Sequence, residues 1–517
     1  MQIGVPRESS PSETRVAATP STVPQLLKLG YDVVVERGAG QRADFPDSAY
    51  TEAGARLGEA PEVWASDVVL ACNPPTDEEL ALMLPGATLV SMLSPALHPE
   101  VAERYAEAGI SALSLDAVPR ISRAQALDVL SSMANIAGYR AVIEAAQAYG
   151  GMFTGQVTAA GKVPPARVFV VGAGVAGLAA IGIAGSMGAQ VRAFDVRPEV
   201  GEQIESMGAT FVEVGAVDTN VSSDGYAKEM TADQAELAAR MYAEESRTAD
   251  IIVTTAQIRG KAAPILLTAE MIAAMKPGSV IVDMAASTGG NTALTRADEK
   301  VVTDNGVTII GWTDLAGRLP RQASQLLGTN LVNLLKLVTP EKDGRLVLDF
   351  DDEVVRSMTV TRKGAVTWPP PPVKVSAAAP APVATPAAEV AKPTESPAEL
   401  ARRKRTRNLV AAGLAMVIFF IIGGLSPLGI LGHWMVLMLA VFVGFYVISN
   451  VTHALHTPLM AETNAISGII MVGALLQVGS SSVPVTILSW VAILVASINV
   501  FGGFLVTNRM LAMFRKA

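Results

Sequence analysis

The stretch VFVVGAGVAGLAAIGIA, residues Val168–Ala184, decides the fold of this chain. Its β-branched and aromatic beginning predicts a buried strand, and the alanine-rich run after the glycines predicts a helix. The glycines stand in G-x-G-x-x-G register. The first permits a tight turn, the second lets the backbone approach a pyrophosphate, and the third lets helix and strand pack closely. The helix N-terminus then faces the phosphates. We therefore predict a dinucleotide-binding turn made of Gly172, Gly174, Val175, Ala176 and Gly177.

A carboxylate ends the next predicted strand, QVRAFDV, at Asp195. At this place an acidic residue hydrogen-bonds the ribose 2′-hydroxyl of NAD and repels the 2′-phosphate of NADP. Arg197 follows closely and would favour NADP, but the acid at the strand end should dominate. We expect NAD(H) to bind here, with Val196 and Arg197 also at the site. A glycine turn with a structural role only is the alternative.

Apolar runs such as DVVVERG, DVVLACN and ATLVSML alternate with polar, helix-like stretches, and the rhythm resumes from RVFVVGAG to VTIIGWT. This alternation is typical of βαβ units, so we expect an α/β fold with two Rossmann-like lobes and parallel sheets. The first lobe should span residues 1–130 and be completed by about 315–368. The NAD-binding lobe should span 131–314. Long helical stretches at 128–150 and 324–338 should bridge the lobes, and the cleft between them is the default ligand site.

Beyond residue 368 the composition changes twice. Proline and alanine dominate 369–399 and the basic cluster RRKRTR follows, so residues 369–407 predict an extended linker. From 408 to 508 the only charged residue is Glu462. Four apolar segments, each near the ~20 residues that cross a bilayer, lie at about 409–425, 431–451, 458–479 and 484–507. We predict four transmembrane helices, with buried core helices as the alternative. Flanking basic residues indicate that both ends, including the tail 509–517, are cytoplasmic.

Composition excludes several classes of function. The formal net charge of −8 provides no large basic field for nucleic acid. A single cysteine, Cys72, excludes a disulfide framework and a cysteine metal cluster, and we expect no metal site. The N-terminus MQIGVPRESS lacks the basic and apolar regions of a secretory signal, so the first part of the chain should fold in the cytoplasm.

Several long motifs, in the same order, resemble the α subunits of proton-translocating NAD(P) transhydrogenases nearly end to end. They are VPRISRAQALDVLSSMANIAGYRAV, VTAAGKVPPARVFVVGAGVAGLAAI, DGYAKEM, TDLAGRLPRQASQLLGTNLVNLLKL and HALHTPLMAETNAISGIIMVGALLQ. The resemblance implies that this chain binds NADH while a separate β subunit binds NADP(H). Hydride would pass directly between the two nicotinamides, coupled to proton movement across the membrane. It further implies a homodimer of α within a heterotetramer, in the lipid of the bacterial inner membrane, with the nucleotide-binding part in the cytoplasm.

The resemblance also assigns residues to the site. Those that match the family's nicotinamide-facing loop are Arg120, Gln125, Asp128 and Ser131. The family's mobile loop over the nucleotide matches Asp224–Lys228, where Gly225 and Tyr226 would contact the nucleotide and Tyr226 forms the tip.

Hydride transfer between two nicotinamides needs no nucleophile and no general acid or base, because the cofactors carry the chemistry. The protein supplies placement, so Gln125, Asp128 and Tyr226 would act in catalysis by orienting the ring and the ribose. As an alternative, Arg120 and Asp128 only cap the bridging helix, since an aspartate near a helix start is favourable.

Two of the four histidines, His453 and His456, lie in the stretch NVTHALHTPLMAETNAISG between apolar segments. If helical, they share a face, and Asn464 lies close to three turns beyond His453. Polar groups at bilayer depth are costly and usually functional, and a histidine that titrates near neutral pH suits a proton path. Equally, Thr457 and Pro458 can begin the third segment and place both histidines in a cytoplasmic turn.

Two other functions are weighed against this one. The lobes resemble alanine dehydrogenase, which uses a lysine in a K-x-K-E-P stretch and a histidine after the next strand. The counterparts here, LACNPP and SMLSPAL, contain neither. Arg15, in ETRVAATP, is retained, but arginine alone cannot take the proton that oxidative deamination releases. A non-catalytic NAD sensor on a membrane anchor is the second alternative, because the chain contains one dinucleotide fingerprint.

Overall fold

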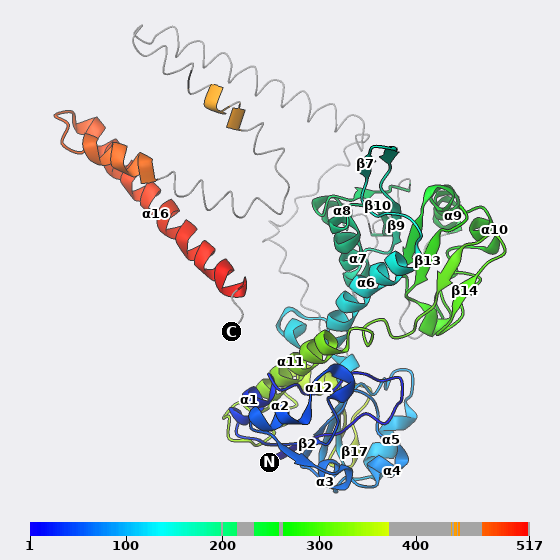
Figure 1. Ribbon diagram of the computed structural model, residues 1–517. Helices are drawn as coiled ribbons and strands as arrows, with labels where there is room; N and C mark the ends of the chain where they lie inside the picture. Colours follow the sequence, from blue (N-terminus) through cyan, green and yellow to red (C-terminus); the bar gives the residue numbers. More distant parts are fainter. Residues whose placement is uncertain are drawn as a thin grey trace, which may run out of the picture. The chain divides into compact units, whose positions relative to one another are not determined.

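The computed structural model describes residues 1–197, 200–214, 232–257, 262–371, 436, 439–441, 443–444 and 468–514, with no side-chain surroundings for 232–233 and 499–514. The chain divides into two units, Met1–Ala379 and Pro380–Ala517. Unit 1 contains two α/β lobes, each on its own mainly parallel sheet (Figure 1). The structure therefore confirms the predicted α/β class and the two Rossmann-like lobes.

The first lobe is built on an eight-stranded sheet in the order β17-β16-β6-β5-β4-β1-β2-β3. Its strands are β1 (Gln2–Val5), β2 (Asp32–Glu36), β3 (Arg56–Gly58), β4 (Val68–Leu70), β5 (Thr88–Ser91), β6 (Ser111–Ser114), β16 (Thr359–Arg362) and β17 (Ala365–Val366). β1 to β6 pair in parallel, whereas β16 pairs antiparallel with β6 and with β17. The end of unit 1 thus completes the sheet that its beginning starts.

Both faces of this sheet are covered. The helices of the lobe include α1 (Val23–Leu27), α2 (Asp47–Glu52), α3 (Ala60–Trp64), α4 (Asp77–Leu80), α5 (Glu100–Glu107) and α12 (Glu353–Met358). Along β4, Val68 and Leu70 pack in one apolar core and Val69 in another. Burial on both faces explains why the central strands are almost continuously apolar.

The second lobe is built on a seven-stranded sheet in the order β11-β10-β9-β12-β13-β15-β14. Its strands are β9 (Arg167–Val171), β10 (Gln190–Phe194), β11 (Thr210–Phe211), β12 (Ile251–Thr254), β13 (Val280–Asp283), β14 (Lys300–Val302) and β15 (Thr308–Ile310), of which only β14 pairs antiparallel. The chain leaves β9 toward β10 first and later resumes at β12. Ligands of such sheets bind outside the carboxyl ends of the strands at this switch point.

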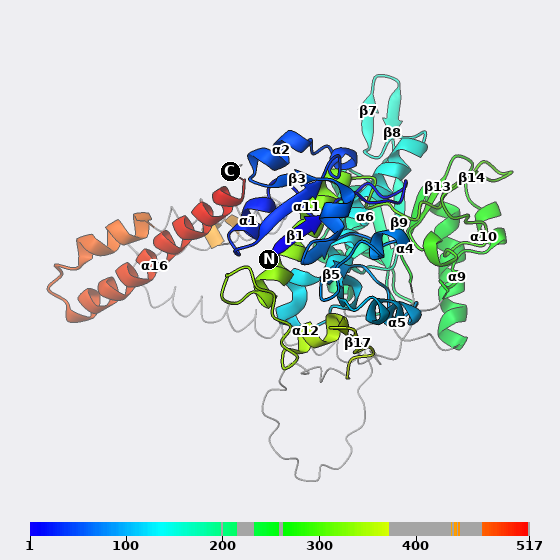
Figure 2. The same ribbon diagram turned by 90° about the horizontal axis from the view of Figure 1, so that it is seen from below.

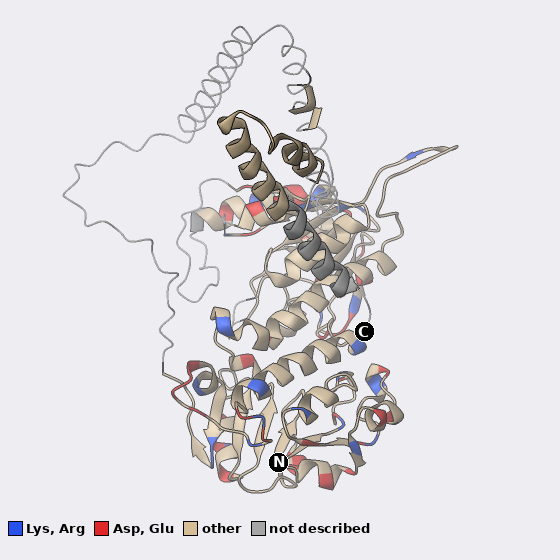
Figure 3. Ribbon diagram, turned by 90° about the vertical axis from the view of Figure 1, so that its left-hand side faces the viewer, with Lys and Arg blue, Asp and Glu red and all other residues tan. Residues whose placement is uncertain are grey.

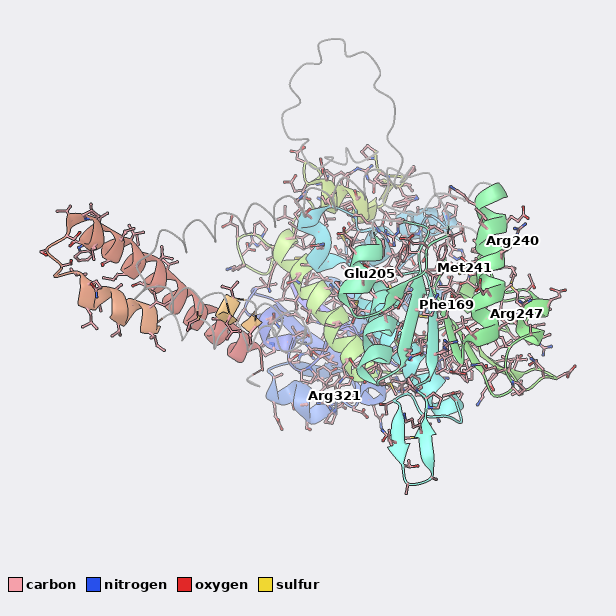
Figure 4. All side chains as sticks on the ribbon, turned by 90° about the horizontal axis from the view of Figure 1, so that it is seen from above. Phe169, Glu205, Arg240, Met241, Arg247 and Arg321 are labelled. Carbon is pink, nitrogen blue, oxygen red and sulfur yellow. The ribbon has the colours of Figure 1, made fainter. Side chains whose placement is uncertain are left out.

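Helices cover the second sheet on both sides. They include α7 (Val175–Ser186), α8 (Gly201–Ser206), α9 (Ala232–Thr248) and α10 (Ala269–Ala273). Val168 and Val170 of β9 pack in one core, whereas Phe169 packs in the core on the side of α9. Met241 of α9 borders that same core, and Figure 4 labels both Phe169 and Met241.

One long helix, α6 (Val129–Ala148), connects the lobes. Its first half is buried in the core of the first lobe as far as Ile136, and its second half is buried in that of the second lobe from Ala141 on. Ala137 packs against both cores. The helix therefore crosses from one lobe to the other at Ala137.

A second crossing returns the chain to the first lobe. We call residues 311–319 the return segment, because they connect β15 with α11 (Pro320–Val338). Leu315 is buried in the second core and Ala316 in the first. The chain thus changes lobes between these two residues.

A two-stranded hairpin, β7 (Gln156–Thr158) and β8 (Gly161–Val163), projects from the second lobe (Figure 1, Figure 2). All six of its strand residues are exposed, and Val157 retains 78% of its accessible surface.

In unit 2 the structure describes helical residues 468–477 and the helix α16 (Val483–Phe514), with a few residues before them. The described side chains of this unit carry no formal charge, in contrast to the charged lobes (Figure 3). Side chains of α16 are described as far as Ile498, and within the described residues no helix is long and apolar enough to cross a membrane. The predicted linker from residue 372 on and the first apolar segment lie outside the described residues.

Candidate functional site

The glycine turn follows β9 and begins α7. Gly172 has φ +92°, and a Cβ there would collide with the hydroxyl oxygen of Thr255. At Gly177 a Cβ would collide with the carbonyl oxygen of Gly172, so α7 approaches the strand this closely only with a glycine. A Cβ at Gly174 would meet no atom within 4 Å. There is therefore free space beside the one glycine that should face a pyrophosphate, whereas the other two glycines are closely packed against the protein.

Asp195 comes directly after β10 and holds the glycine turn. Its Oδ2 accepts a hydrogen bond from the amide nitrogen of Ala173 at 2.8 Å. Its Oδ1 accepts from the backbone nitrogen and the Nε of Arg197, both at 2.9 Å, and Oδ2 accepts from Nη2 at 3.0 Å. The residue is 8% exposed, so one buried carboxylate both fixes the turn and neutralises Arg197. Val196 packs against the core on the α9 side.

The segment after β12 forms hydrogen bonds with the backbone of the glycine turn. The hydroxyl of Thr255 donates to the carbonyl oxygen of Val171 at 3.2 Å and to that of Gly172 at 3.1 Å. Asn291 then fixes the following loop, because its Nδ2 donates to the carbonyl oxygen of Ala256 and its Oδ1 accepts from the nitrogen of Ala256. Neither Thr255 nor Asn291 belongs to a motif that predicts a site from sequence. Thr255 comes directly after β12 at the ligand-binding edge, a position that could have identified it from sequence, whereas Asn291 lies in a loop without such a signal.

The predicted nicotinamide-facing residues lie between β6 and the first turn of α6. Arg120 is exposed, and Gln125 is exposed on a 3₁₀ helix, Ser122–Leu127. Asp128 is the N-cap of α6, where its Oδ1 accepts from the amide nitrogen of Ser131 at 2.9 Å and its Oδ2 from the hydroxyl of Ser131 at 2.5 Å. The capping role that the sequence offers as the alternative for Asp128 is therefore present in the structure.

This loop is fixed by the part of the chain that returns from the second lobe. Asn330 and Asn333 of α11 both donate to the carbonyl oxygen of Ala126, at 2.9 and 3.1 Å. Arg123 makes two hydrogen bonds to the carboxylate of Asp352, at 2.7 and 2.9 Å. Hydrogen bonds from two later elements thus hold the exposed Gln125 in place without using its own side chain.

The two halves of the site share a rigid contact. Gly138 of α6 lies so close to the start of α7 that a Cβ on it would collide with the carbonyl oxygen of Ala176. The helix that begins with Asp128 and Ser131 therefore packs directly on the helix that begins with the glycine turn. Their relative position is set by backbone contact at a glycine.

The first lobe has its own polar cluster at the carboxyl ends of β1 and β4. Arg15, whose side chain is 10% exposed, donates from Nε and Nη2 to the two oxygens of Glu13 at 2.7 and 2.6 Å. Asn73 donates from Nδ2 to both Glu13 and Glu8, at 2.8 and 3.1 Å. Burial favours the neutral acid, but the hydrogen bonds and charge of Arg15 hold the pKa of Glu13 below its ordinary value. This arginine is therefore already bound to an internal carboxylate.

Several predicted residues belong to parts of the chain that the structure does not describe. Gly225 and Tyr226, with the rest of Asp224–Lys228, lie outside the described residues, and so do His453, His456 and Asn464.

Comparison with known proteins gives three family matches along the chain. Residues 4–137 match the N-terminal domain, and residues 141–369 the C-terminal domain, of "Alanine dehydrogenase/PNT". Residues 433–516 match the "4TM region of pyridine nucleotide transhydrogenase".

Individual relatives agree with these matches. The chain is 56% identical to NAD(P) transhydrogenase subunit alpha of Haemophilus influenzae, over 100% of both chains. A solved transhydrogenase from Sinorhizobium meliloti is 42% identical and superposes with a TM-score of 0.64, covering 71% of this chain and 100% of that one. Alanine dehydrogenase of Bacillus subtilis is more distant, at 30% identity over 71% of this chain and 93% of its own length.

Proposed function

This chain belongs to the family of NAD(P) transhydrogenase alpha subunits, and on that premise we propose that NAD(H) binds at its glycine turn and exchanges hydride with NADP(H) on a partner β subunit. The transfer is coupled to proton movement across the bacterial inner membrane. Membership of the family supports the reaction class, and the residues around the glycine turn support the assignment of the NAD(H) site to this chain.

The buried Asp195 between Ala173 and Arg197 is the observation that carries this assignment. A carboxylate at this strand end hydrogen-bonds the 2′-hydroxyl of an adenosine ribose and repels a 2′-phosphate. Arg197 adds no free positive charge, because its guanidinium is bound to that carboxylate. The open space over Gly174 and the N-terminus of α7 suit the pyrophosphate. The described residues therefore fit NAD(H) better than NADP(H).

Placement is what the remaining residues contribute to the reaction. The nicotinamide itself supplies the hydride, so the protein needs no acid, base or nucleophile. We assign Gln125, Asp128 and Tyr226 to orienting the ring and its ribose, and Arg120 and Ser131 to binding. The fixed backbone at Ala126 supports this role, because a pre-organised loop loses little entropy when a ligand binds.

The C-terminal part anchors the chain in the membrane as four transmembrane helices. The match of residues 433–516 to a 4TM region supports this, and so does the single charge, Glu462, between residues 408 and 508. The basic cluster at 402–407 favours a cytoplasmic nucleotide-binding part. Residues 369–407 then act as a linker between an assembly of soluble lobes, 1–368, and the membrane part, with 509–517 as a cytoplasmic tail.

The assembly we propose is two α chains with two β subunits. The projecting hairpin, on which Val157 and Val163 are both exposed, offers a surface for contact between α chains. The β subunit contributes the NADP(H) site, because this chain contains a single dinucleotide fingerprint.

The test is an assay of NADH-to-NADP⁺ hydride transfer with the chain alone and with the β subunit co-purified from membranes. We expect NADH binding by the chain alone, measured by fluorescence titration, and transfer only with both subunits. A chain that binds NADH but never transfers hydride with its β subunit would support the NAD-sensor alternative instead.

Alanine dehydrogenase activity is disfavoured by the first lobe. Arg15 is bound to Glu13, and the residue after Cys72 at the end of β4 is Asn73, which is engaged with two glutamates. Neither residue can take a proton from an amino acid. We expect no alanine-dependent reduction of NAD⁺ by the purified chain.

A further inference from the structure

The contacts around Glu144 connect the two crossings between the lobes. Glu144 lies on the second-lobe half of α6, and its side chain is 7% exposed. Its Oε1 accepts from Arg140 at 2.8 Å and from Nη1 of Arg318 at 3.1 Å, and its Oε2 accepts from Nε1 of Trp312 at 3.2 Å. The guanidinium of Arg318 also lies over the Trp312 ring, 4.2 Å from its centroid. One carboxylate on the bridging helix thus holds both ends of the return segment.

The Glu144–Arg318 pair joins opposite sides of the lobe boundary. Glu144 lies beyond Ala137, where α6 has already entered the second lobe, whereas Arg318 lies beyond Ala316, where the return segment has already entered the first. A movement of one lobe against the other must therefore change the distance between these two side chains or bend the elements that carry them.

A second ion pair crosses the same boundary, and here the return segment contributes the residue on the second-lobe side. Arg15 belongs to the first lobe, and its Nη2 lies 3.8 Å from the carboxylate of Asp314, on the second-lobe side of the return segment. The hydroxyl of Thr14 donates to the carbonyl oxygen of Gly317 at 2.6 Å. The return segment is thus held by α6 on one side and by the N-terminal loop on the other.

The Glu144 cluster is ionised and partly shielded from water. Burial favours the neutral acid of Glu144. The hydrogen bond and charge of Arg140, the charge of Arg318 and the hydrogen bond from Trp312 outweigh this effect and hold the pKa of Glu144 below its ordinary value. Removing one partner of a buried ion pair costs more free energy of unfolding than removing one partner of an exposed pair. The reason is that the remaining buried charge is no longer compensated. This distinguishes the cluster from the surface pair Arg240–Glu236 on α9, whose side chains are 73% and 65% exposed.

We propose that Glu144 and Arg318 are positioning residues for hydride transfer, acting through the angle between the lobes. This inference rests on the proposed function, in which the second lobe binds the nucleotide at the glycine turn while Gln125 and Asp128 of the first lobe face the nicotinamide. The lobe angle then decides where the ring lies relative to its partner nicotinamide. Misplacement by about 1 Å lowers a transfer rate by up to roughly 100-fold, whereas binding of the adenosine half depends on the second lobe alone.

The principal variant is Arg318→Met, because methionine keeps an unbranched apolar side chain but lacks the guanidinium, with its charge and its hydrogen bond to Glu144, while Glu144 keeps Arg140 and Trp312 as partners. Glu144→Gln is the second variant, and Glu144→Asp tests whether a retained charge restores function. Arg240→Met is the matched control, since it deletes the same guanidinium from an exposed ion pair within α9, on which Figure 4 labels Arg240.

All variants are made in the full α chain co-purified with its β subunit. NADH affinity is measured by fluorescence titration, the single-turnover rate of NADH-to-NADP⁺ transfer by stopped flow, and folding by thermal unfolding. We expect Arg318→Met to lower the transfer rate on the order of tenfold with NADH affinity within about twofold of wild type. The double variant with Glu144→Gln should be no slower than Glu144→Gln alone, because the two residues act as one pair. Glu144→Asp should transfer faster than Glu144→Gln, and Arg240→Met should match wild type.

The possible results distinguish a failure of the proposed function from a failure of the positioning role alone. A wild-type complex that binds NADH without transferring hydride would contradict the proposed function itself. An active wild type, with Arg318→Met and Glu144→Gln both at the wild-type rate, would overturn the positioning role alone. Equal losses of NADH affinity and transfer rate in these variants would also overturn it, because they would show general damage to the fold.

Discussion

The carboxylate of Asp195 lies between the amide nitrogen of Ala173, at 2.8 Å, and the guanidinium of Arg197, at 2.9 Å. It therefore joins the end of β10 to the glycine turn after β9. Because the same carboxylate neutralises Arg197, the residue that could attract a 2′-phosphate is held by the residue that repels one. On the proposed assignment, nucleotide preference at this site is a property of the pair.

Asp195→Asn should reverse much of the preference for NADH. Loss of a charge-assisted hydrogen bond to the ribose should weaken NADH binding by roughly tenfold, and release of Arg197 should strengthen NADPH binding. Fluorescence titration of both nucleotides measures the ratio. Adding Arg197→Ala to this variant should remove the gain for NADPH.

Glu205→Gln is the control for that experiment, because Glu205 is an exposed carboxylate of α8 in the same lobe (Figure 4). It should leave both affinities unchanged. If Asp195→Asn also leaves the NADH-to-NADPH ratio unchanged, the assignment of Asp195 to the ribose is wrong.

Gly174→Ala and Gly177→Ala should fail in different ways. A Cβ at Gly174 meets nothing in the protein, so the variant should keep its free energy of unfolding and lose NADH affinity. A Cβ at Gly177 meets the carbonyl oxygen of Gly172, so this variant should lose about 1–3 kcal/mol of unfolding free energy. Chemical denaturation and NADH titration of both variants make the comparison. Normal NADH affinity in Gly174→Ala would argue against phosphate binding at the turn.

Asp128 can be tested for a role beyond capping. Asp128→Ser keeps an N-cap for α6, whereas Asp128→Ala removes it at a cost of about 1 kcal/mol. If the carboxylate also orients the nicotinamide or its ribose, both variants should slow hydride transfer. Gln125→Asn and Tyr226→Phe should slow hydride transfer as well, since both residues are assigned to the same placement. A normal transfer rate in Asp128→Ser would leave Asp128 as a helix cap only.

Much of the proposed nucleotide site could be predicted from local sequence. Glycine spacing and a strand-end acid are short-range patterns, and the structure gives Gly172, Gly177 and Asp195 the surroundings that those patterns require. The two-lobe fold followed from alternating apolar runs, whose residues are buried on both faces of the sheets.

Contacts between distant parts of the chain could not be predicted from the sequence. Asn330 and Asn333 hold Ala126 across some 200 residues, and Asn291 holds the loop after β12, but an asparagine in a helix or a loop carries no local mark of its partner. The Glu144–Arg318 pair is of the same kind. Its existence depends on where two crossings between lobes bring their side chains together, which hydrophobic periodicity does not encode.

The histidine pair is tested by coupling stoichiometry. If His453 or His456 lies on a proton path that also uses Asn464, then His453→Ala or His456→Ala should lower the number of protons moved per hydride transferred in sealed vesicles. NADH binding by the lobes should stay the same. A wild-type ratio in both variants, with reduced stability or assembly, is the result expected for an interfacial turn.

The most direct test of the central claim follows the hydrogen itself. NADH carrying two deuterium atoms at C4 of the nicotinamide is mixed with NADP⁺ and the complex of this chain with its β subunit in ordinary water. The NADPH that forms is then analysed by mass spectrometry. Direct transfer between the nicotinamides predicts one deuterium in every NADPH molecule. NADPH without deuterium would show that the hydrogen exchanges with water on the way, and would contradict the account.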